Sequence, residues 1–150
     1  MFTSYNTLFV GKVFIHLDKV ASTNEHTLNL LKNSDLVEGT LISTSYQYAG
    51  KGQRGNIWLS QANKNITISI VFHPKWLLIS NQFMLSKAIA LGILSFTKTL
   101  LDPNKLRIKW PNDLYYEDKK LGGILIETLL SGKSLKTAVV GIGLNINQLI

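Results

Sequence analysis

Two basic, glycine-rich segments contain the residue types best suited to chemistry on an anion. In "GKGQRG" (Gly50 to Gly55), glycines let backbone N–H groups approach a ligand closely, and Lys51 and Arg54 place two cations on one short turn. In "KWPNDLYYEDKKLGGILIE" (Lys109 to Glu127), a polar turn and a lysine pair precede two adjacent glycines. Such groups suit a phosphate or an acyl phosphate. An ordinary solvated hairpin would explain either segment taken alone.

The first segment also has the spacing G-x-G-x-x-G, which occurs in dinucleotide-binding folds. Those folds need a helix directly after the glycines and an acidic residue about 20 positions later. Here the glycines are followed by the turn-rich "NIWLSQANKN", and the stretch from Gly39 to Leu101 has no carboxylate. The sequence therefore argues against a dinucleotide-binding fold.

The second segment predicts a pocket built at strand ends. Pro111 moves Trp110 away from helical geometry and forms a turn, so Lys109 and Asp113 should lie where two strands end and their side chains can converge. Lys120 belongs to the next turn. The two glycines that follow leave the strand bare of side chains, which suits the close approach of a flat ligand.

The elements that must position these segments are mostly strands. β-branched and alternating patterns predict strands at 12–17, 40–46, 65–73, 106–110, 113–117, 121–130 and 135–146. Helices are predicted at 22–33, opened by a capping box of Ser22 and Glu25, and at 81–101, where apolar residues recur at helical spacing. We predict an α+β fold with a mixed or antiparallel sheet and helices packed on one face.

Composition narrows the class of protein. A chain of 150 residues fits one domain with its own core, and the absence of cysteine excludes disulfides and points to a reducing, cytoplasmic compartment. No signal peptide and no uninterrupted apolar run of membrane-spanning length is present, so we expect no membrane association. The three histidines are far apart and no acidic cluster has ligand spacing, so no protein metal site is expected.

Four motifs in order resemble those of the biotin protein ligases: "STN" (22–24), "GKGQRGNIW" (50–58), "KWPNDLYYEDKKLGGILIE" (109–127) and "GIGLNIN" (141–147). The resemblance implies the biotin/lipoate ligase fold, which is similar to class II aminoacyl-tRNA synthetases. It implies an ATP- and Mg²⁺-dependent enzyme that converts biotin to biotinyl-5'-AMP, releases pyrophosphate, and transfers biotin to one lysine of a biotin carboxyl carrier protein.

The same resemblance assigns roles residue by residue. The residues implied for biotin binding are Ser22, Thr23, Asn24, Gln47, Lys51, Gly123, Ile124 and Leu125. Those implied for binding ATP or the adenylate are Lys51, Gly52, Gln53, Arg54, Trp58, Asn112 and Lys120. Those implied for catalysis are Lys120, Arg54, Lys51 and Asp113.

The sequence also departs from the family pattern. Many members have arginine at the position of Gln53, so the adenylate phosphate should have less charge around it. Residues 1–150 are expected to form a catalytic domain without the family's C-terminal helices and small β-barrel domain. The DNA-binding helix-turn-helix of some members is also missing, so no DNA binding is expected. A homodimer could form through an exposed sheet edge.

Two other functions fit parts of the sequence. A lipoate or octanoate ligase or transferase shares the fold, but it lacks the pairing of "KWPND" with "KLGGILIE". A non-enzymatic basic nucleic-acid-binding domain would explain the net charge of +7. That domain should interleave aromatic and basic residues, whereas Trp58, Phe72 and Trp76 lie in or beside apolar runs. A ligand-binding but inactive fragment is a third reading.

Overall fold

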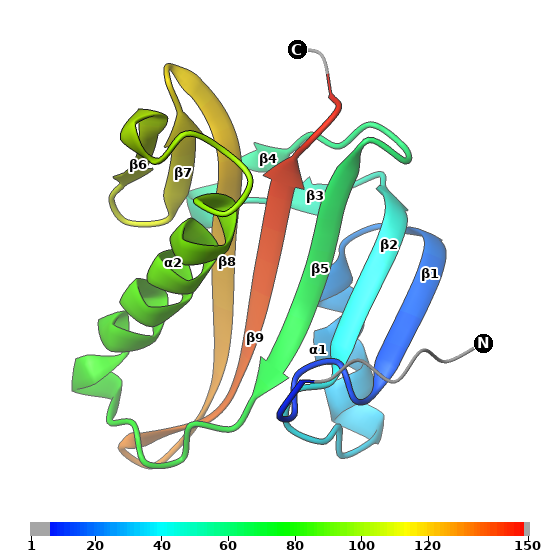
Figure 1. Ribbon diagram of the computed structural model, residues 1–150. Helices are drawn as coiled ribbons and strands as arrows, with labels where there is room; N and C mark the ends of the chain where they lie inside the picture. The colour runs from blue at the N-terminus through cyan, green and yellow to red at the C-terminus, as the bar shows by residue number, and fades with distance from the viewer. Residues whose placement is uncertain (1–6, 149–150) are drawn as a thin grey trace.

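The computed structural model describes residues 7–148, which form a seven-stranded sheet and two helices (Figure 1). The strand order is β1 (Phe14–Val20), β2 (Leu41–Gln47), β5 (Asn65–Phe72), β9 (Ser134–Asn145), β8 (Lys119–Ser131), β7 (Asp113–Tyr116) and β6 (Leu106–Lys109). The β1–β2 pair is parallel and every other pair in this sheet is antiparallel. The prediction of an α+β fold with a mixed sheet is confirmed.

Helix α1 (Thr23–Asn33) connects the two parallel strands, a connection that requires a crossover. It begins as predicted, because Ser22 is the N-cap and its hydroxyl accepts from the backbone N–H of Glu25 at 3.4 Å. Helix α2 (Phe83–Thr97) is shorter than predicted. A small ribbon pairs β3 (Gly50–Lys51) with β4 (Ile57–Trp58), and short 3-10 turns occupy Gln53–Gly55, Ile79–Asn81 and Pro103–Lys105.

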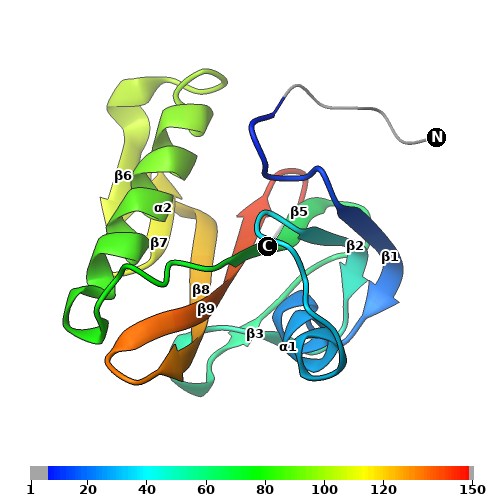
Figure 2. The same cartoon turned by 90° about the horizontal axis from the view of Figure 1, so that it is seen from below.

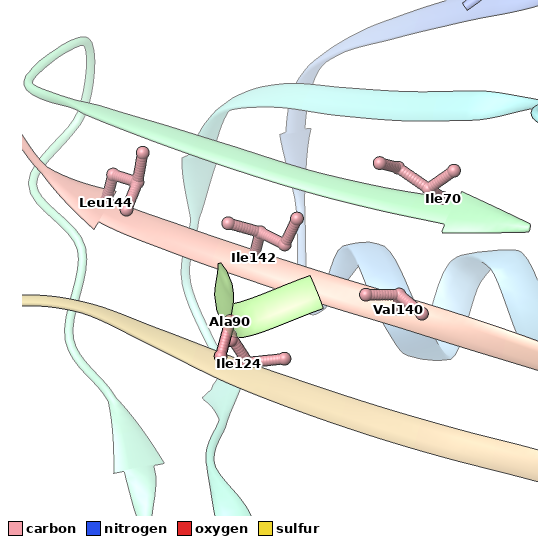
Figure 3. Close-up of a cluster of buried hydrophobic side chains, with 6 residues drawn as sticks. All are labelled: Ile70, Ala90, Ile124, Val140, Ile142 and Leu144. Atoms are coloured by element: carbon pink, nitrogen blue, oxygen red, sulfur yellow. The ribbon is translucent and has the colours of Figure 1, made fainter. Parts of the chain in front are cut away.

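The main apolar core lies between the sheet and α2. Side chains from three neighbouring strands meet Ala90 of α2 in one buried cluster (Figure 3), whose strand members are Ile70, Ile124, Val140, Ile142 and Leu144. Its β9 members, Val140, Ile142 and Leu144, alternate along the second half of the strand, as expected where one face packs on a core. The other face of β9 is therefore available for a different purpose.

The prediction that the helices pack on one face of the sheet is wrong. Ser69 Oγ lies 2.8 Å from Thr23 Oγ1 of α1, whereas the next residue, Ile70, belongs to the core cluster with Ala90 of α2. Neighbouring strand residues point to opposite faces, so α1 and α2 cover opposite sides. Figures 1 and 2 show α1 and the β3–β4 ribbon on one side and α2 on the other. Alternating small polar and large apolar residues on β5 produce this division.

The outer side of α2 remains apolar. Phe83, Met84, Leu91 and Phe96 are exposed, although the helix contacts β6, β7 and β8. By length and composition alone the stretch Ile79–Thr97 would also suffice to cross a membrane. One such helix is weak evidence for a membrane span, because core helices of soluble proteins have the same length and composition. Helix α2 thus presents apolar side chains both to the sheet and to the surface.

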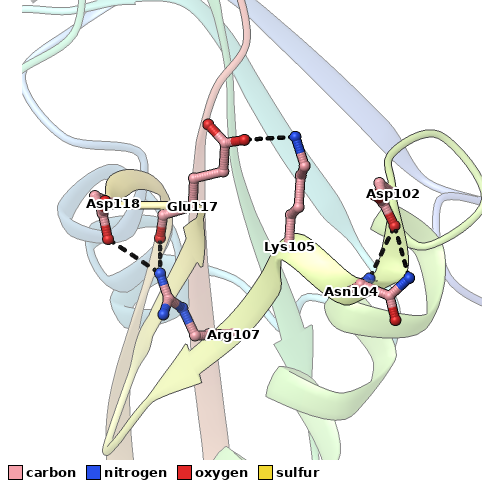
Figure 4. A network of polar contacts seen from close by, with 6 residues as sticks. All are labelled: Asp102, Asn104, Lys105, Arg107, Glu117 and Asp118. Carbon is pink, nitrogen blue, oxygen red and sulfur yellow. Dashed lines mark hydrogen bonds and ion pairs between the residues drawn. The ribbon is translucent and has the colours of Figure 1, made fainter.

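Charged residues of the β6–β7 hairpin neutralise one another (Figure 4). Lys105 Nζ lies 2.6 Å from Glu117 Oε1, and Arg107 donates to Asp118 Oδ1 at 3.1 Å and to the carbonyl oxygen of Glu117. The ion pair raises the pKa of Lys105 and lowers the pKa of Glu117. Part of the basic charge of the chain therefore has local partners and does not form an open cationic surface.

Candidate active site

A cleft of about 470 Å³ lies on the α1 side of the sheet, between the start of α1, the β3–β4 ribbon and the 109–113 turn. All residues assigned to a site from the sequence line it: Ser22, Thr23, Asn24, Gln47, Lys51, Gly52, Gln53, Arg54, Trp58, Asn112, Asp113, Lys120, Gly123, Ile124 and Leu125. The structure thus brings together residues from three distant segments, 22–24, 47–58 and 112–125. Their individual roles stay predictions.

The glycine-rich segment is a short antiparallel ribbon that borders the cleft. Gly50 pairs with Trp58 and Lys51 with Ile57, and the tip closes through a hydrogen bond of 2.7 Å from Gly52 N to the carbonyl oxygen of Asn56. Arg54 and Gly55 both have positive φ, at 55° and 81°. Glycine adopts a positive φ without strain, so the backbone geometry of the tip explains why residue 55 is glycine.

Lys51 of this ribbon already has an acidic partner. Its Nζ lies 2.9 Å from Glu25 Oε2 in α1, and this hydrogen bond raises the pKa of Lys51 above its ordinary value. Both side chains are about half exposed, so the pair adds little to the stability of the fold. The ammonium group is therefore held at the cleft by a bond that an incoming anion can replace.

Lys120 lies at the start of β8, where it contacts two groups of the cleft. Its Nζ is 2.8 Å from Asp113 Oδ1 and 5.4 Å from the centre of the Trp58 ring. The paired β7 and β8 strands hold the lysine and the carboxylate close together. A cation between a carboxylate and an aromatic face is well oriented to meet a phosphate or carboxylate from the cleft.

The Trp58 indole lies against two bare glycine positions. A Cβ at Gly123 would lie 2.9 Å from Trp58 Cζ3, and a Cβ at Gly143 would lie 2.5 Å from Trp58 Cζ2. Any larger residue at Gly143 would therefore displace the indole. Trp58 Nε1 is buried and has no hydrogen-bond partner among residues 7–148. In this structure the indole covers the surface that was predicted as the wall for biotin.

Several cleft residues were given no binding or catalytic role from the sequence: Asn56, Ile57, Thr67, Ile68, Lys109, Trp110, Pro111, Gly141, Ile142 and Gly143. For Gly141 and Gly143 a signal was available. Glycines two positions apart on a strand leave one face bare, and that face is the one opposite the core. The pairing of Glu25 with Lys51 could not be predicted from local sequence, because the two residues belong to elements that are distant in the chain.

The cleft combines three chemical environments. Hydroxyl and amide groups gather at the start of α1, apolar atoms of β8 and β9 line the middle, and Lys51, Arg54 and Lys120 supply positive charge. This arrangement suits a ligand with a polar head, an apolar body and an anionic end. Among residues 7–148 no group of three or more His, Cys, Asp or Glu side chains could hold a metal ion.

Comparison with protein-family models decides the family. Residues 17–145 match the Biotin/lipoate A/B protein ligase family, which is most of the chain. The chain belongs to this family. Its fold is the biotin/lipoate ligase fold, as the four motifs predicted.

Curated relatives in the family are ligases. The "Bifunctional ligase/repressor BirA" of Bacillus spizizenii is 34% identical over 145 residues, which are 95% of this chain and 43% of that protein. The protein of the same name from Escherichia coli is 35% identical over 133 residues, 88% of this chain and 39% of that protein. The chain thus spans less than half the length of these two relatives.

Solved structures agree with this placement. A biotin protein ligase of Aquifex aeolicus in complex with biotin and ATP superposes with a TM-score of 0.68 at 32% identity, over 93% of this chain and 54% of that one. The biotin acetyl coenzyme A carboxylase synthetase of Helicobacter pylori with bound biotinylated ATP gives a TM-score of 0.68 at 29% identity, over 91% and 61%. Biotin and ATP are therefore ligands of its structural relatives.

Proposed function

We propose that this chain is the catalytic part of an ATP-dependent biotin–protein ligase. It joins biotin to ATP, forms biotinyl-5'-AMP, and transfers biotin to a lysine of a biotin carboxyl carrier protein. The observation that carries the proposal is a single cleft that combines hydroxyl and amide groups with Lys51, Arg54 and Lys120 in a member of this family. The absence of cysteine supports a cytoplasmic, reducing location.

In the first step a biotin carboxylate oxygen attacks the α-phosphorus of ATP. The bond from that phosphorus to the oxygen bridging the β-phosphate breaks, and pyrophosphate leaves. Two anions must approach each other, so catalysis depends on fixed positive charge. We assign the positive charge to Lys120 and to Lys51 and Arg54 of the ribbon. Lys120 would exchange its ion pair with Asp113 for contacts with the reacting carboxylate and phosphate.

In the second step the amine of the carrier lysine attacks the biotinyl carbonyl carbon. An amide bond forms, the bond to the phosphate oxygen breaks, and AMP leaves. The attacking amine must lose a proton. Asp113 is the carboxylate that lines the cleft, and we assign it to orient this amine or to accept its proton.

Ligand binding divides between the two ends of the cleft. Ser22, Thr23 and Gln47 supply polar groups for the ureido ring of biotin, while Ile124 and Leu125 contact its tail. For the adenine we assign Asn112 and, by stacking, Trp58. Because the indole now covers Gly123, the biotin ring can reach that glycine only after Trp58 moves.

Magnesium would enter bound to the phosphates of ATP. Such ions retain several waters and need one or two carboxylates from the protein. The cleft fits this requirement, because Asp113 can provide one carboxylate once Lys120 turns to the substrate. Magnesium would supply charge neutralisation on the leaving pyrophosphate.

Replacing Gln53 by arginine should slow dissociation of the biotinyl adenylate. Gln53 lies at the ribbon tip and lines the cleft. Arginine adds a charge-assisted hydrogen bond, roughly twice as strong as a neutral one, so dissociation should slow by about tenfold. Stopped-flow displacement of the preformed adenylate measures the rate. Gln53→Lys is the matched control for charge alone, and an unchanged rate in both variants would place residue 53 away from the phosphate.

Transfer is tested by incubating the chain with labelled biotin, Mg-ATP and a purified carrier domain. Label should appear on one carrier lysine and disappear when that lysine is replaced by arginine. Lipoate and octanoate are tested in parallel, because other members of the fold family use such acids. Label from lipoate but not from biotin would reverse the substrate assignment.

A further inference from the structure

A chain of buried and partly buried hydrogen bonds runs behind the polar end of the cleft, connecting β8, the start of α1, β5 and β2. It joins Glu127, Asn24, Ser69, Thr23 and Gln47. Ser69 is fully buried, and Thr23, Asn24 and Gln47 are nearly so. Ser69 and Glu127 do not line the cleft, so neither is a direct ligand contact.

The direction of each bond can be derived from the Glu127 end. The nitrogen Nδ2 of Asn24 lies 2.9 Å from Glu127 Oε2 and 3.1 Å from the carbonyl oxygen of Leu125. Carbonyl and carboxylate oxygens accept, so the amide nitrogen of Asn24 must face them. Asn24 Oδ1 is then turned to Ser69, whose Oγ is 2.6 Å away and must donate.

Ser69 Oγ also lies 2.8 Å from Thr23 Oγ1 and holds that hydroxyl in place. The Thr23 hydroxyl donates to Gln47 Oε1 at 3.2 Å, because an amide oxygen can only accept. The Thr23 backbone N–H donates to Gln47 Oε1 at 2.8 Å. The Gln47 oxygen is therefore occupied, and its amide nitrogen is turned away, beside Gly50, where an added Cβ would lie 2.5 Å from it.

The end result is a fixed donor in the cleft. Gln47 Nε2 donates to none of the residues in 7–148, and the Ser22 hydroxyl nearby accepts only from a backbone N–H. Both residues line the cleft, so both groups can donate to a carbonyl oxygen of a ligand bound there. Asn24, in contrast, has both ends of its amide occupied by protein groups.

We infer that Glu127, acting through Asn24 and Ser69, is a positioning and specificity-determining residue that fixes Gln47 as a donor to the ureido carbonyl of biotin. This inference rests on the proposed function. It also changes the role of Asn24, which holds the donors in place and does not bind the ligand. A dithiolane or alkyl group has no acceptor for these donors, so the same chain of bonds discriminates against lipoate and octanoate.

The test measures the Kd of biotin for the parent chain, Glu127→Ala and Glu127→Gln. Loss of a partly buried bond to a charged acceptor should weaken biotin binding by roughly tenfold or more in Glu127→Ala. Glu127→Gln keeps an oxygen that accepts from Asn24, so its Kd should stay within about threefold of the parent. Glu127→Gln and Glu127→Ala both remove the negative charge that acts on Lys51. A difference between the two variants therefore reports the hydrogen bond to Asn24 and not the charge.

Two further readouts distinguish positioning from general loss of structure. The Kd of lipoate should be nearly the same in all variants, and the double variant Glu127→Ala/Ser69→Ala should bind biotin no worse than the weaker single variant. Equal loss in Glu127→Ala and Glu127→Gln, parallel weakening of lipoate, or additive losses would each overturn the inference. If the parent chain does not bind biotin, the proposed function itself fails.

Discussion

Replacing Lys120 by alanine should reduce adenylate formation by about 100- to 1000-fold, the cost of removing one fixed donor from a developing charge. Lys120 supplies the cation that lies between Asp113 and Trp58. Biotin-dependent exchange of labelled pyrophosphate into ATP measures the step directly. The thermal unfolding midpoint should change little, because the side chain is partly exposed and its ion pair is not a core contact.

Lys119→Ala is the matched control for this prediction. It removes the same charge one residue away, on the exposed neighbour of Lys120. Alternate strand residues point to opposite faces, so Lys119 is directed away from Lys120 and should keep near-parental exchange. Equal effects of both substitutions would mean that only overall charge matters, and near-parental exchange in the Lys120 variant would remove that residue from the mechanism.

Ligand binding should strongly slow amide exchange in the ribbon from Tyr48 to Ile57. In the free chain the ribbon has two short strands, a glycine-rich tip and an exposed Lys51–Glu25 pair, so its local opening should be easy. If opening requires the ligand to leave, the adenylate at a hundred times its Kd should slow exchange by about 100-fold. Biotin alone should protect the segment only partly, because the phosphate contacts are missing.

Hydrogen exchange followed by mass spectrometry measures this effect peptide by peptide. Helix α2 provides the internal control, since none of its residues lines the cleft and its protection should not depend on ligand. The Glu25→Gln variant tests the role of the ion pair: without it the free ribbon should open more often, while the adenylate complex should be unaffected. Equal protection of the ribbon in the free, biotin-bound and adenylate-bound states would show a rigid hairpin.

Much of the fold could be predicted because local sequence and tertiary packing agree. The capping box of Ser22 and Glu25 starts α1 where expected, and the β-branched run 65–73 forms β5. The residues predicted for the site, most of which belong to three recognisable motifs, lie together along one cleft. The order of the motifs identified these segments as parts of one site, although they are far apart in the chain.

The relative placement of the helices was not predictable from the same patterns. Both helices have apolar positions, and the choice of face depends on which strands they contact, which is a long-range property. Thr67 and Ser69 form the small polar face of β5 that α1 covers. In the sequence, this alternation of polar and apolar residues is indistinguishable from that of a strand with one face in solvent. The contacts of Glu25 and Glu127 were missed for a similar reason, because each joins elements distant in sequence.

The cleft should activate biotin with ATP. Incubating the chain with Mg-ATP and biotin, lipoate or octanoate, and analysing the products by mass spectrometry, measures this activation. The biotin sample should give biotinyl-5'-AMP with one equivalent of pyrophosphate, and the other two acids should give far less adduct. Adduct from lipoate or octanoate in the absence of any from biotin would contradict this expectation, as would a chain that binds biotin and ATP without forming an adenylate.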